Sequence, residues 1–380
     1  MPWKEMCTMQ QRLEFVRLAE QEGSNRRELC RRFGISPQTG YKWLERAASG
    51  VEDWVADRSR RPHASPGRVS GSVEDAVLAV RDAHPAWGAR KIWHVLARAG
   101  QDMPAPSTVH AILARHGRIS LPARPPATGR FELPAPNLIW QMDFKGRIVL
   151  QDGRQWCHPL TVVDDHSRYA LCLQACDNET GATVQGELQR VFRRYGLPEA
   201  FLVDNGSPWG NGPAGGWTWL GVWLLKLGVD VIRARPYHPQ TRGKNERFHR
   251  SLKAEVLSLQ RFRSLGDMQR AFDRWRHIYN CQRPHQALGF DVPASRYRLS
   301  PRPMPDRLPK IDYAQSDIVR TVGPSKPYIS FKGHLWQISK AFMGERVALR
   351  PLSKDGRYGV FFATKKIATI DLNNPPKQPQ

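Results

Sequence analysis

The order of expected strands and helices between residues 138 and 290 is the feature that most constrains how this chain can fold. Three segments rich in Val, Ile, Leu, Trp and Tyr come first, at Ile139–Leu150, Gln155–Val163 and Tyr169–Ala175. Asp-Gly and Asp-Asp pairs separate them, which predicts a three-stranded antiparallel meander. Helix and strand patterns alternate after it. The sequence therefore predicts a mixed α/β domain built on one sheet.

The second half of this region sets the topology of that sheet. The expected elements are a helix, a buried strand, a buried apolar helix, a further strand and a last helix, at Ala182–Tyr195, Ala200–Val203, Trp217–Leu227, Asp230–Ala234 and from about Lys244. An antiparallel meander followed by alternating helices and strands is the order of a ribonuclease-H-like domain. In that order the first strand neighbours the strand that ends before Asp204. We assign this α/β core to residues 138–300.

Three carboxylates occupy positions that this topology brings together. Asp143 interrupts an apolar stretch inside the first strand, where a buried carboxylate is costly unless a cation compensates it. Asp204 follows a buried strand in an Asp-Asn-Gly sequence that is also a common turn former. Glu246 lies in the first turn of the last helix, where the helix macrodipole also favours an acid. Together the three acids supply oxygen ligands for hard divalent cations, and they predict a two-metal site for phosphoryl chemistry.

The helix that carries Glu246 combines an apolar stripe with a basic one. Its apolar residues recur at every fourth position and predict an amphipathic helix: Phe248, Leu252 and Val256. Glu246, His249, Arg250 and Lys253 are expected to share the other face. We predict DNA contacts from this region by Arg242, Lys244, Arg250 and Lys253. The alternative for His249 and Arg250 is a solvated position on the helix.

Other polar residues near this helix have weaker claims to a functional role. Arg283 and His285 fit DNA contacts and equally fit a lock on the end of the preceding helix, Leu265–Tyr279. Four further acids fall in expected turns or at strand edges and are assigned structural roles: Asp152, Asp164, Asp165 and Asp230.

The charge of the chain narrows the class of partner. Its formal net charge is +23, and residues 233–310 hold 18 Lys and Arg against 6 Asp and Glu. Such a surplus argues against an ordinary metabolic enzyme and favours a polyanionic partner such as nucleic acid. The longest apolar segment, Trp217–Val229, is short and contains Lys226, so it predicts a buried helix and not a membrane span. No signal-peptide pattern follows Met1.

Residues 1–55 are predicted to form a helix-turn-helix DNA-binding domain. Residues 10–48 show three helical patterns, and Ser36 and Pro37 form a strong start signal for the third. Gln38, Thr39 and Lys42 near that start are the expected DNA contacts. Four arginines crowd the preceding helix and favour DNA binding over any other small three-helix bundle: Arg26, Arg27, Arg31 and Arg32.

A basic linker and a second three-helix unit follow. Residues 56–71 show no hydrophobic period, and their arginines could follow a minor groove or belong to a solvated tether: Arg58, Arg60 and Arg61. Residues 72–118 are predicted to form a second helix-turn-helix domain, with DNA contacts from Ser107 and Thr108 at the start of its last helix. A Pro-rich linker, residues 119–137, separates this unit from the core.

The C-terminal part is predicted to be all β. Residues 310–372 show short strands with Gly-containing turns and basic residues, which favours a small β-barrel. The six cysteines of the chain form no CxxC pair, so reduced thiols in a cytoplasm are expected and zinc is not.

The chain resembles the transposases of bacterial insertion sequences that share a catalytic core with retroviral integrases. These transposases are of the DDE class. The resemblance runs over nearly the whole chain and is carried by four stretches: Trp140–Phe144, Phe201–Gly206, His238–His249 and Tyr279–Leu288. It implies a ribonuclease-H-like core and catalytic, metal-binding roles for Asp143, Asp204 and Glu246. It also implies two Mg²⁺ ions per site, with Mn²⁺ as a substitute.

The resemblance further implies the reaction and the partners. The protein would bind the terminal inverted repeats, hydrolyse a phosphodiester at each transposon end and join the freed 3′ hydroxyls to target DNA. It would act as a homo-oligomer on double-stranded DNA, away from membranes, in a bacterial cytoplasm with the nucleoid. The alternatives are a non-catalytic DNA-binding regulator with a decayed core, and a sequence-tolerant nuclease that cuts without joining.

The chain departs from the family pattern at two points. More residues than is typical separate Asp204 from Glu246, and we place the surplus in residues 207–218, as a longer loop over the site. The zinc-binding histidine-cysteine unit of retroviral integrases is absent from the sequence, and helix-turn-helix units stand in its place.

Overall fold

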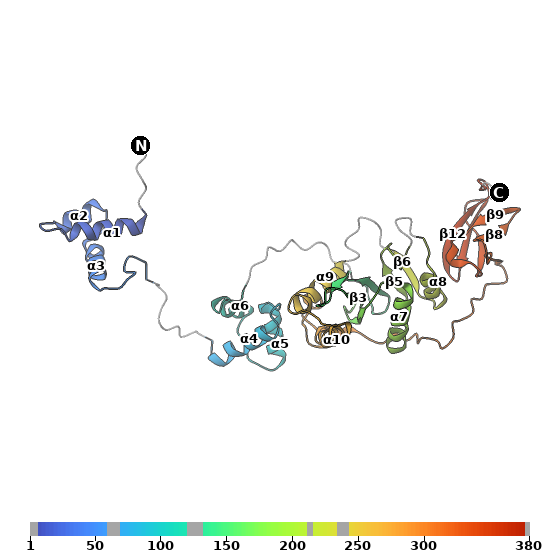
Figure 1. The fold of residues 1–380 in the computed structure, drawn as a ribbon, viewed down its shortest axis with the longest axis horizontal. Helices are drawn as coiled ribbons and strands as arrows, with labels where there is room; N and C mark the ends of the chain where they lie inside the picture. Colours follow the sequence, from blue (N-terminus) through green and yellow to red (C-terminus); the bar gives the residue numbers. More distant parts are fainter. Residues whose placement is uncertain (1–6, 59–68, 120–131, 211–215, 234–242, 377–380) are drawn as a thin grey trace. The chain divides into compact units, whose positions relative to one another are not determined.

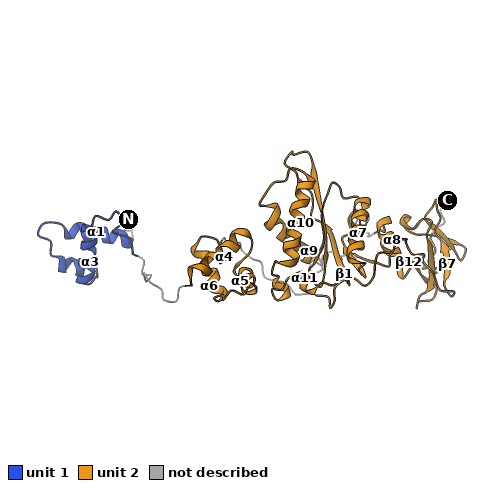
Figure 2. Ribbon diagram, turned by 90° about the horizontal axis from the view of Figure 1, so that it is seen from below, with its two compact units in different colours: residues 1–68 blue, residues 69–380 orange. Residues whose placement is uncertain are grey.

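The computed structural model describes residues 7–58, 69–119, 132–210, 216–233 and 243–376. It divides into two compact units, residues 1–68 and 69–380, coloured separately in Figure 2. Figure 1 gives the labels of the helices and strands. The finer domain boundaries drawn from the sequence stay predictions.

The first unit contains the three predicted helices. They are α1 (Thr8–Ala19), α2 (Arg26–Arg32) and α3 (Pro37–Ala48). Ser36 caps α3, because its side chain accepts a hydrogen bond from the Thr39 amide. A small core of Phe15, Val16, Cys30 and Trp43 holds the helices together. A Cβ at Gly40 would lie 2.6 Å from Cys30 Sγ, so glycine permits the close approach of α3 to this core.

The second unit begins with three more helices. They are α4 (Gly71–Ala83), α5 (Ala89–Arg98) and α6 (Pro106–Arg115). Their apolar faces meet in a core that is centred on the buried Trp87 and Ile92. The helical patterns predicted for this region are confirmed.

The central sheet has six strands. They are β1 (Ile139–Phe144), β2 (Ile148–Val149), β3 (Trp156–Asp164), β4 (Ala170–Cys176), β5 (Ala200–Val203) and β6 (Asp230–Arg233). The order is β2-β3-β1-β5-β6, and β4 pairs with β3 along residues His158–Val163. β3 runs antiparallel to β1 and β4, whereas β1, β5 and β6 are parallel neighbours. The meander and the adjacency of the first strand to the strand before Asp204 are therefore confirmed.

Helices cover both faces of this sheet. The core on one face includes side chains of α7 (Gly181–Tyr195) and α8 (Trp219–Lys226). The core on the other face includes side chains of α9 (Gly243–Leu252), the π-helical turn η2 (Lys253–Leu257) and α10 (Leu265–Cys281). The apolar segment predicted as a buried helix is α8. None of the helices in the described residues combines the length and apolar character that a membrane span requires.

Two short helices lead from α10 towards the C-terminal strands. They are η3 (Gln286–Leu288) and α11 (Pro293–Arg296). The strands are β7 (Ile318–Thr321), β8 (Tyr328–Phe331), β9 (His334–Gln337), β10 (Arg346–Pro351), β11 (Arg357–Phe362) and β12 (Lys365–Asp371), with the short helix η4 (Lys340–Phe342) between β9 and β10.

The C-terminal strands do not show the predicted closed barrel. They form a four-stranded sheet in the order β12-β11-β10-β7 and a separate β8-β9 hairpin. In this pairing β12 and β7 are the two outer strands of their sheet, so hydrogen bonding along the ladder does not close on itself. Both sheets contribute to one apolar core, which also includes Val222 and Leu225 of α8.

Candidate active site

Asp143 and Asp204 lie at the same edge of the central sheet. In the parallel ladder of β1 and β5, Trp140 is paired with Phe201 and Gln141 with Leu202. If this register is continued by two residues, Asp143 comes opposite Asp204. The carboxyl ends of parallel neighbours meet at one sheet edge, and there such strands carry ligand-binding groups. Both aspartates are half-buried.

The turn after β5 orients Asp204 and begins the longer loop of this chain. The Gly206 amide donates a hydrogen bond to Asp204 Oδ1 at 3.0 Å. Trp209 is buried and its ring lies 6.0 Å from that of Phe144, the residue after Asp143. The described start of the loop is therefore packed beside β1, while residues 211–215 of the predicted 207–218 loop lie outside the described residues.

Glu246 is exposed in the first turn of α9, and the start of that helix is bonded to β1. The Asn245 amide donates to Gln141 Oε1 at 3.3 Å. One turn further on, His249 Nε2 lies 2.9 Å from Thr161 Oγ1 on β3. The Thr161 hydroxyl donates in turn to the Asp143 carbonyl oxygen at 2.9 Å. The helix of Glu246 is thus hydrogen-bonded to the strand of Asp143 both directly and through β3.

His249 has a structural role that the sequence pattern misassigned. A face shared with Glu246 was predicted, with a solvated position as the alternative for His249, but the His249 side chain is buried beside the fully buried Thr161. Because Thr161 donates its only hydroxyl proton to Asp143, His249 Nε2 must carry the proton that bonds to Thr161. Burial, and then the charge of Lys145, lower the pKa of His249 to about 4, so the ring is neutral at pH 7.

The donor types of the three acids fit a hard divalent cation, but the structure does not assemble them into a complete site. Carboxylate oxygens are the ligands that Mg²⁺ takes from proteins. Among the described residues, no three His, Cys, Asp or Glu side chains lie close enough together to hold a metal ion. Close approach of three carboxylates without a cation is opposed by their mutual repulsion. The predicted catalytic and metal-binding roles of Asp143, Asp204 and Glu246 stay predictions.

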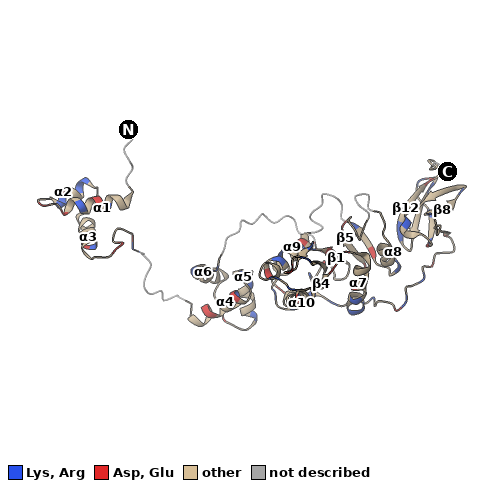
Figure 3. Ribbon diagram, viewed as in Figure 1, with Lys and Arg blue, Asp and Glu red and all other residues tan. Residues whose placement is uncertain are grey.

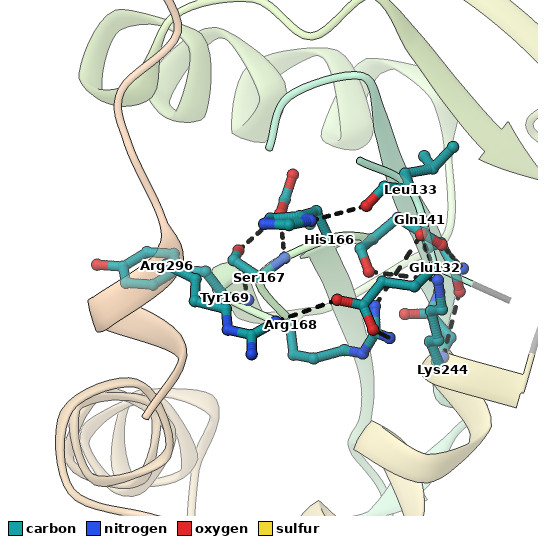
Figure 4. Close-up of polar contacts among 12 residues, drawn as sticks. Glu132, Leu133, Gln141, His166, Ser167, Arg168, Tyr169, Lys244 and Arg296 are labelled. Carbon is teal, nitrogen blue, oxygen red and sulfur yellow. Dashed lines mark hydrogen bonds and ion pairs between the residues drawn. The ribbon is translucent and has the colours of Figure 1, made fainter. Parts of the chain in front are cut away.

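The predicted DNA contacts around α9 occupy different environments. Arg250 and Lys253 are exposed, in keeping with Lys and Arg recurring along this helix (Figure 3). Lys244 instead forms an ion pair with the buried carboxylate of Asp165. Its side chain is only 12% exposed, and burial lowers its pKa. Arg242 lies outside the described residues. The pairing of Lys244 with the turn after β3, drawn in Figure 4, was not foreseen from the sequence.

The predicted contacts of the helix-turn-helix units are mostly at the surface. Gln38 and Lys42 are exposed on α3, and Thr39 between them is half-buried. The four arginines of α2 are all exposed: Arg26, Arg27, Arg31 and Arg32. On α6, Ser107 is exposed and Thr108 is half-buried. Arg58 is exposed, whereas Arg60 and Arg61 lie outside the described residues. These DNA-contact assignments stay predictions.

Arg283 and His285 lie inside the structure. Arg283 Nε donates to Glu255 Oε1 at 2.9 Å, and its Nη2 donates to Ser251 Oγ at 2.9 Å. The His285 ring meets the Tyr279 ring edge-on at 4.6 Å, and burial places its pKa well below the ordinary histidine value. Both residues are 8% exposed. These contacts join the end of α10 to η2 and to the end of α9. Of the two alternatives, they favour a structural lock on the end of α10 over a DNA contact.

Sequence models of known families match most segments of the chain. A homeodomain-like domain is matched at residues 8–55 and another at residues 39–113. The integrase core domain is matched at residues 134–239 and, by a second model, at residues 227–293. The C-terminal domain of the IS481 family of transposases is matched at residues 317–377.

Two proteins of bacterial insertion elements are similar to part of the chain. The IS407 uncharacterized 31.7 kDa protein of Burkholderia multivorans is 29% identical over 160 residues, which cover 42% of this chain and 55% of that protein. The IS476 uncharacterized 39.2 kDa protein of Xanthomonas euvesicatoria is 30% identical over 159 residues, which cover 42% and 44%. The chain thus spans about half the length of these relatives.

Solved structures with a similar chain include two of viral integrases. The HTLV-2 integrase catalytic core domain in complex with magnesium has 14% identity and a TM-score of 0.33, over 43% of this chain and 99% of that chain. The intasome of simian T-cell lymphotropic virus in complex with PP2A regulatory subunit B56 gamma has 15% identity and a TM-score of 0.36, over 73% and 94%. The integrase-type core is assigned from the two matches to integrase core domain models, at residues 134–239 and 227–293.

Proposed function

We propose that this chain, which carries the domains of an insertion-sequence transposase with an integrase-type core, cuts the ends of its mobile element and joins them to target DNA. The observation that carries the proposal is the shared sheet edge of Asp143 and Asp204, beside a helix that presents Glu246 and is bonded to β1.

The three carboxylates would hold two divalent cations, Mg²⁺ or Mn²⁺ in its place. When bound, such ions activate the attacking oxygen and stabilise the leaving one in phosphodiester hydrolysis and strand transfer. Asp143 and Asp204 supply ligands from fixed strand ends, and Glu246 supplies one from α9. Exposed Arg250 and Lys253 continue along the same helical segment, where they would contact the phosphates of the bound end.

The test of the catalytic assignment uses three conservative substitutions. Asp143→Asn, Asp204→Asn and Glu246→Gln should each abolish cleavage of end DNA in Mg²⁺ and leave binding of that DNA largely intact. Asp152→Asn is the matched control, because Asp152 is exposed in the turn between β2 and β3 and caps the amides of Arg154 and Gln155. Near-normal cleavage by any of the three variants would remove that residue from the site.

The helix-turn-helix units would deliver the protein to the terminal inverted repeats as a homo-oligomer. A fragment of residues 1–130 should bind end DNA specifically without metal, with affinity that falls steeply as salt rises, because several arginines neutralise phosphates. Equal affinity for random competitor DNA would leave these units as a basic tether only.

The products of the reaction separate the proposal from its two rivals. A sequence-tolerant nuclease would give cut ends and no joined ends, and a DNA-binding regulator would give neither. Joined products from DNA that carries the element's ends identify a transposase.

A further inference from the structure

We propose that Asp165 and Lys244 are positioning residues for Glu246. Their buried ion pair, together with the hydrogen bonds of Gln141, holds the first turn of α9 against β1. This inference rests on the proposed function, in which Glu246 is catalytic. It assigns a role to Asp165, which is not one of the three acids. It also assigns a different role to Lys244, which was predicted to contact DNA.

The contacts converge on the Asp165 carboxylate. Lys244 pairs with Asp165 Oδ2, and Lys244 Nζ also lies 3.3 Å from the Asp165 carbonyl oxygen. Gln141 Nε2 donates to the other carboxylate oxygen, Oδ1, at 2.8 Å. The Oε1 atom of the same Gln141 side chain accepts a hydrogen bond from the Asn245 backbone N–H at 3.3 Å. Figure 4 shows Gln141 and Lys244 meeting in this network from the sheet and from the helix.

The positions of these residues connect the network to the site. Lys244 lies two residues before Glu246, and Gln141 lies two residues before Asp143 on β1. At the head of α9, Asn245 is therefore bonded directly to the strand of Asp143, and Lys244 is linked to that strand through Asp165. The first turn of a helix lacks internal bonds for its amides, so external partners decide how firmly it is held.

The turn that carries Asp165 is itself fixed. The Asp165 amide donates to the Ile139 carbonyl at the start of β1, at 3.0 Å. Arg168, three residues further on, lies 4.0 Å from Asp165 Oδ2 and 3.8 Å from Glu132, and Glu132 pairs in turn with Arg296 at 3.1 Å. Figure 4 labels Glu132, Arg168 and Arg296 of this chain of ion pairs. Asp165 is thus a rigid acceptor, to which the helix is attached.

Burial makes the pair sensitive to the loss of either member. Gln141 is 2% and Asp165 3% exposed, and the Lys244 side chain is 12% exposed. Removing one charge leaves the other buried without its main partner, which is costly. A DNA contact by Lys244 would require the same loss, because the ammonium would have to leave Asp165. The structure therefore favours positioning over phosphate binding for this lysine.

The test compares Lys244→Met with Asp165→Asn in the full chain. Both variants should lower cleavage of end DNA by about 10- to 100-fold, the usual effect of losing a group that orients a metal ligand. Both should leave end-DNA affinity and its salt dependence unchanged, and both should speed amide hydrogen exchange in the first turn of α9. The double variant should lose little more than either single variant, because the two residues act through one contact.

Two further variants serve as controls. Lys226→Met removes an ion pair with Glu345, 2.5 Å long and 26% exposed at the lysine, and should leave exchange at α9 unchanged. Lys244→Arg keeps a positive charge that can pair with Asp165, and should recover much of the lost cleavage. If Lys244→Met fails to fold, the Asp165→Asn and Lys244→Arg variants carry the test.

The outcomes distinguish this inference from the proposed function. Normal cleavage by Glu246→Gln would refute the catalytic role of Glu246, while hydrogen exchange would still report whether the pair holds α9. If Glu246→Gln is inactive but Lys244→Met or Asp165→Asn cuts at the wild-type rate, the positioning role is wrong. A loss of end-DNA affinity in Lys244→Met alone, with the salt slope reduced by about one unit, would instead make Lys244 a phosphate contact.

Discussion

Replacing Arg283 tests whether a residue of the integrase-like signature serves the fold or the DNA. In Arg283→Met the Glu255 side chain, which is 9% exposed, loses its ion pair and keeps the hydrogen bond from the Trp275 indole N–H, at 2.9 Å. Breaking a buried ion pair from one side costs about 3–5 kcal/mol. The lost bond to Ser251 Oγ adds about 1 kcal/mol. We expect α10 to lose roughly 4–6 kcal/mol of local stability, from these two contributions.

A second variant isolates the ion pair. Arg283→Met combined with Glu255→Met removes both charges, so no buried charge is left uncompensated. The remaining losses are the bond to Ser251 Oγ, about 1 kcal/mol, and the unpaired indole N–H of Trp275, about 1–3 kcal/mol. The double variant should therefore be more stable than Arg283→Met alone.

The assay is hydrogen exchange of the α10 amides as a function of denaturant, which gives a local free energy of opening in a chain with several domains. End-DNA affinity is measured in parallel. Unchanged exchange in Arg283→Met, together with weaker DNA binding and a flatter salt dependence, would refute the lock and restore the DNA-contact alternative.

Two further predictions concern the helix of Glu246. Because the pKa of His249 is about 4 in the folded protein against an ordinary 6.5, the unfolded chain takes up a proton first as pH falls, so stability should decline between about pH 6.5 and 4. His249→Gln should flatten that decline in pH-dependent unfolding, and an unchanged slope would mean that the ring titrates normally. Lys253→Ala, and more weakly Arg250→Ala, should raise the end-DNA concentration needed for strand transfer without altering metal dependence. A variant that saturates at the wild-type concentration and rate would show that these exposed side chains do not touch DNA.

Local sequence patterns were sufficient to predict much of the fold. The four-residue recurrence of Phe248, Leu252 and Val256 predicted α9, and all three side chains are buried. The order of elements predicted that β1 and β5 are neighbours, because the connections available to such a sheet are few.

Contacts between distant segments could not be predicted in this way. Lys244 and Asp165 are 79 residues apart, and a lysine in the first turn of a helix has the same local pattern whether it meets DNA or a buried acid. His249 looked like a member of a polar helical face, and only its meeting with Thr161 on β3 distinguishes burial from solvation. Closure of the C-terminal strands likewise depends on pairing partners that short strand patterns do not specify.

The position of α8 between two hydrophobic cores limits how this protein can be recombined with its relatives. Leu220, Trp223 and Leu224 pack in the core of the central sheet, while Val222 and Leu225 pack among the C-terminal strands. Ion pairs of Lys226 with Glu345 and of Lys365 with Asp230 join the same two regions. A chimera that exchanges only residues 310–372 would place foreign side chains against half of α8. A chimera that exchanges α8 together with the C-terminal strands would instead place foreign α8 side chains in the core of the central sheet. The central sheet, α8 and the C-terminal strands should therefore be exchanged together.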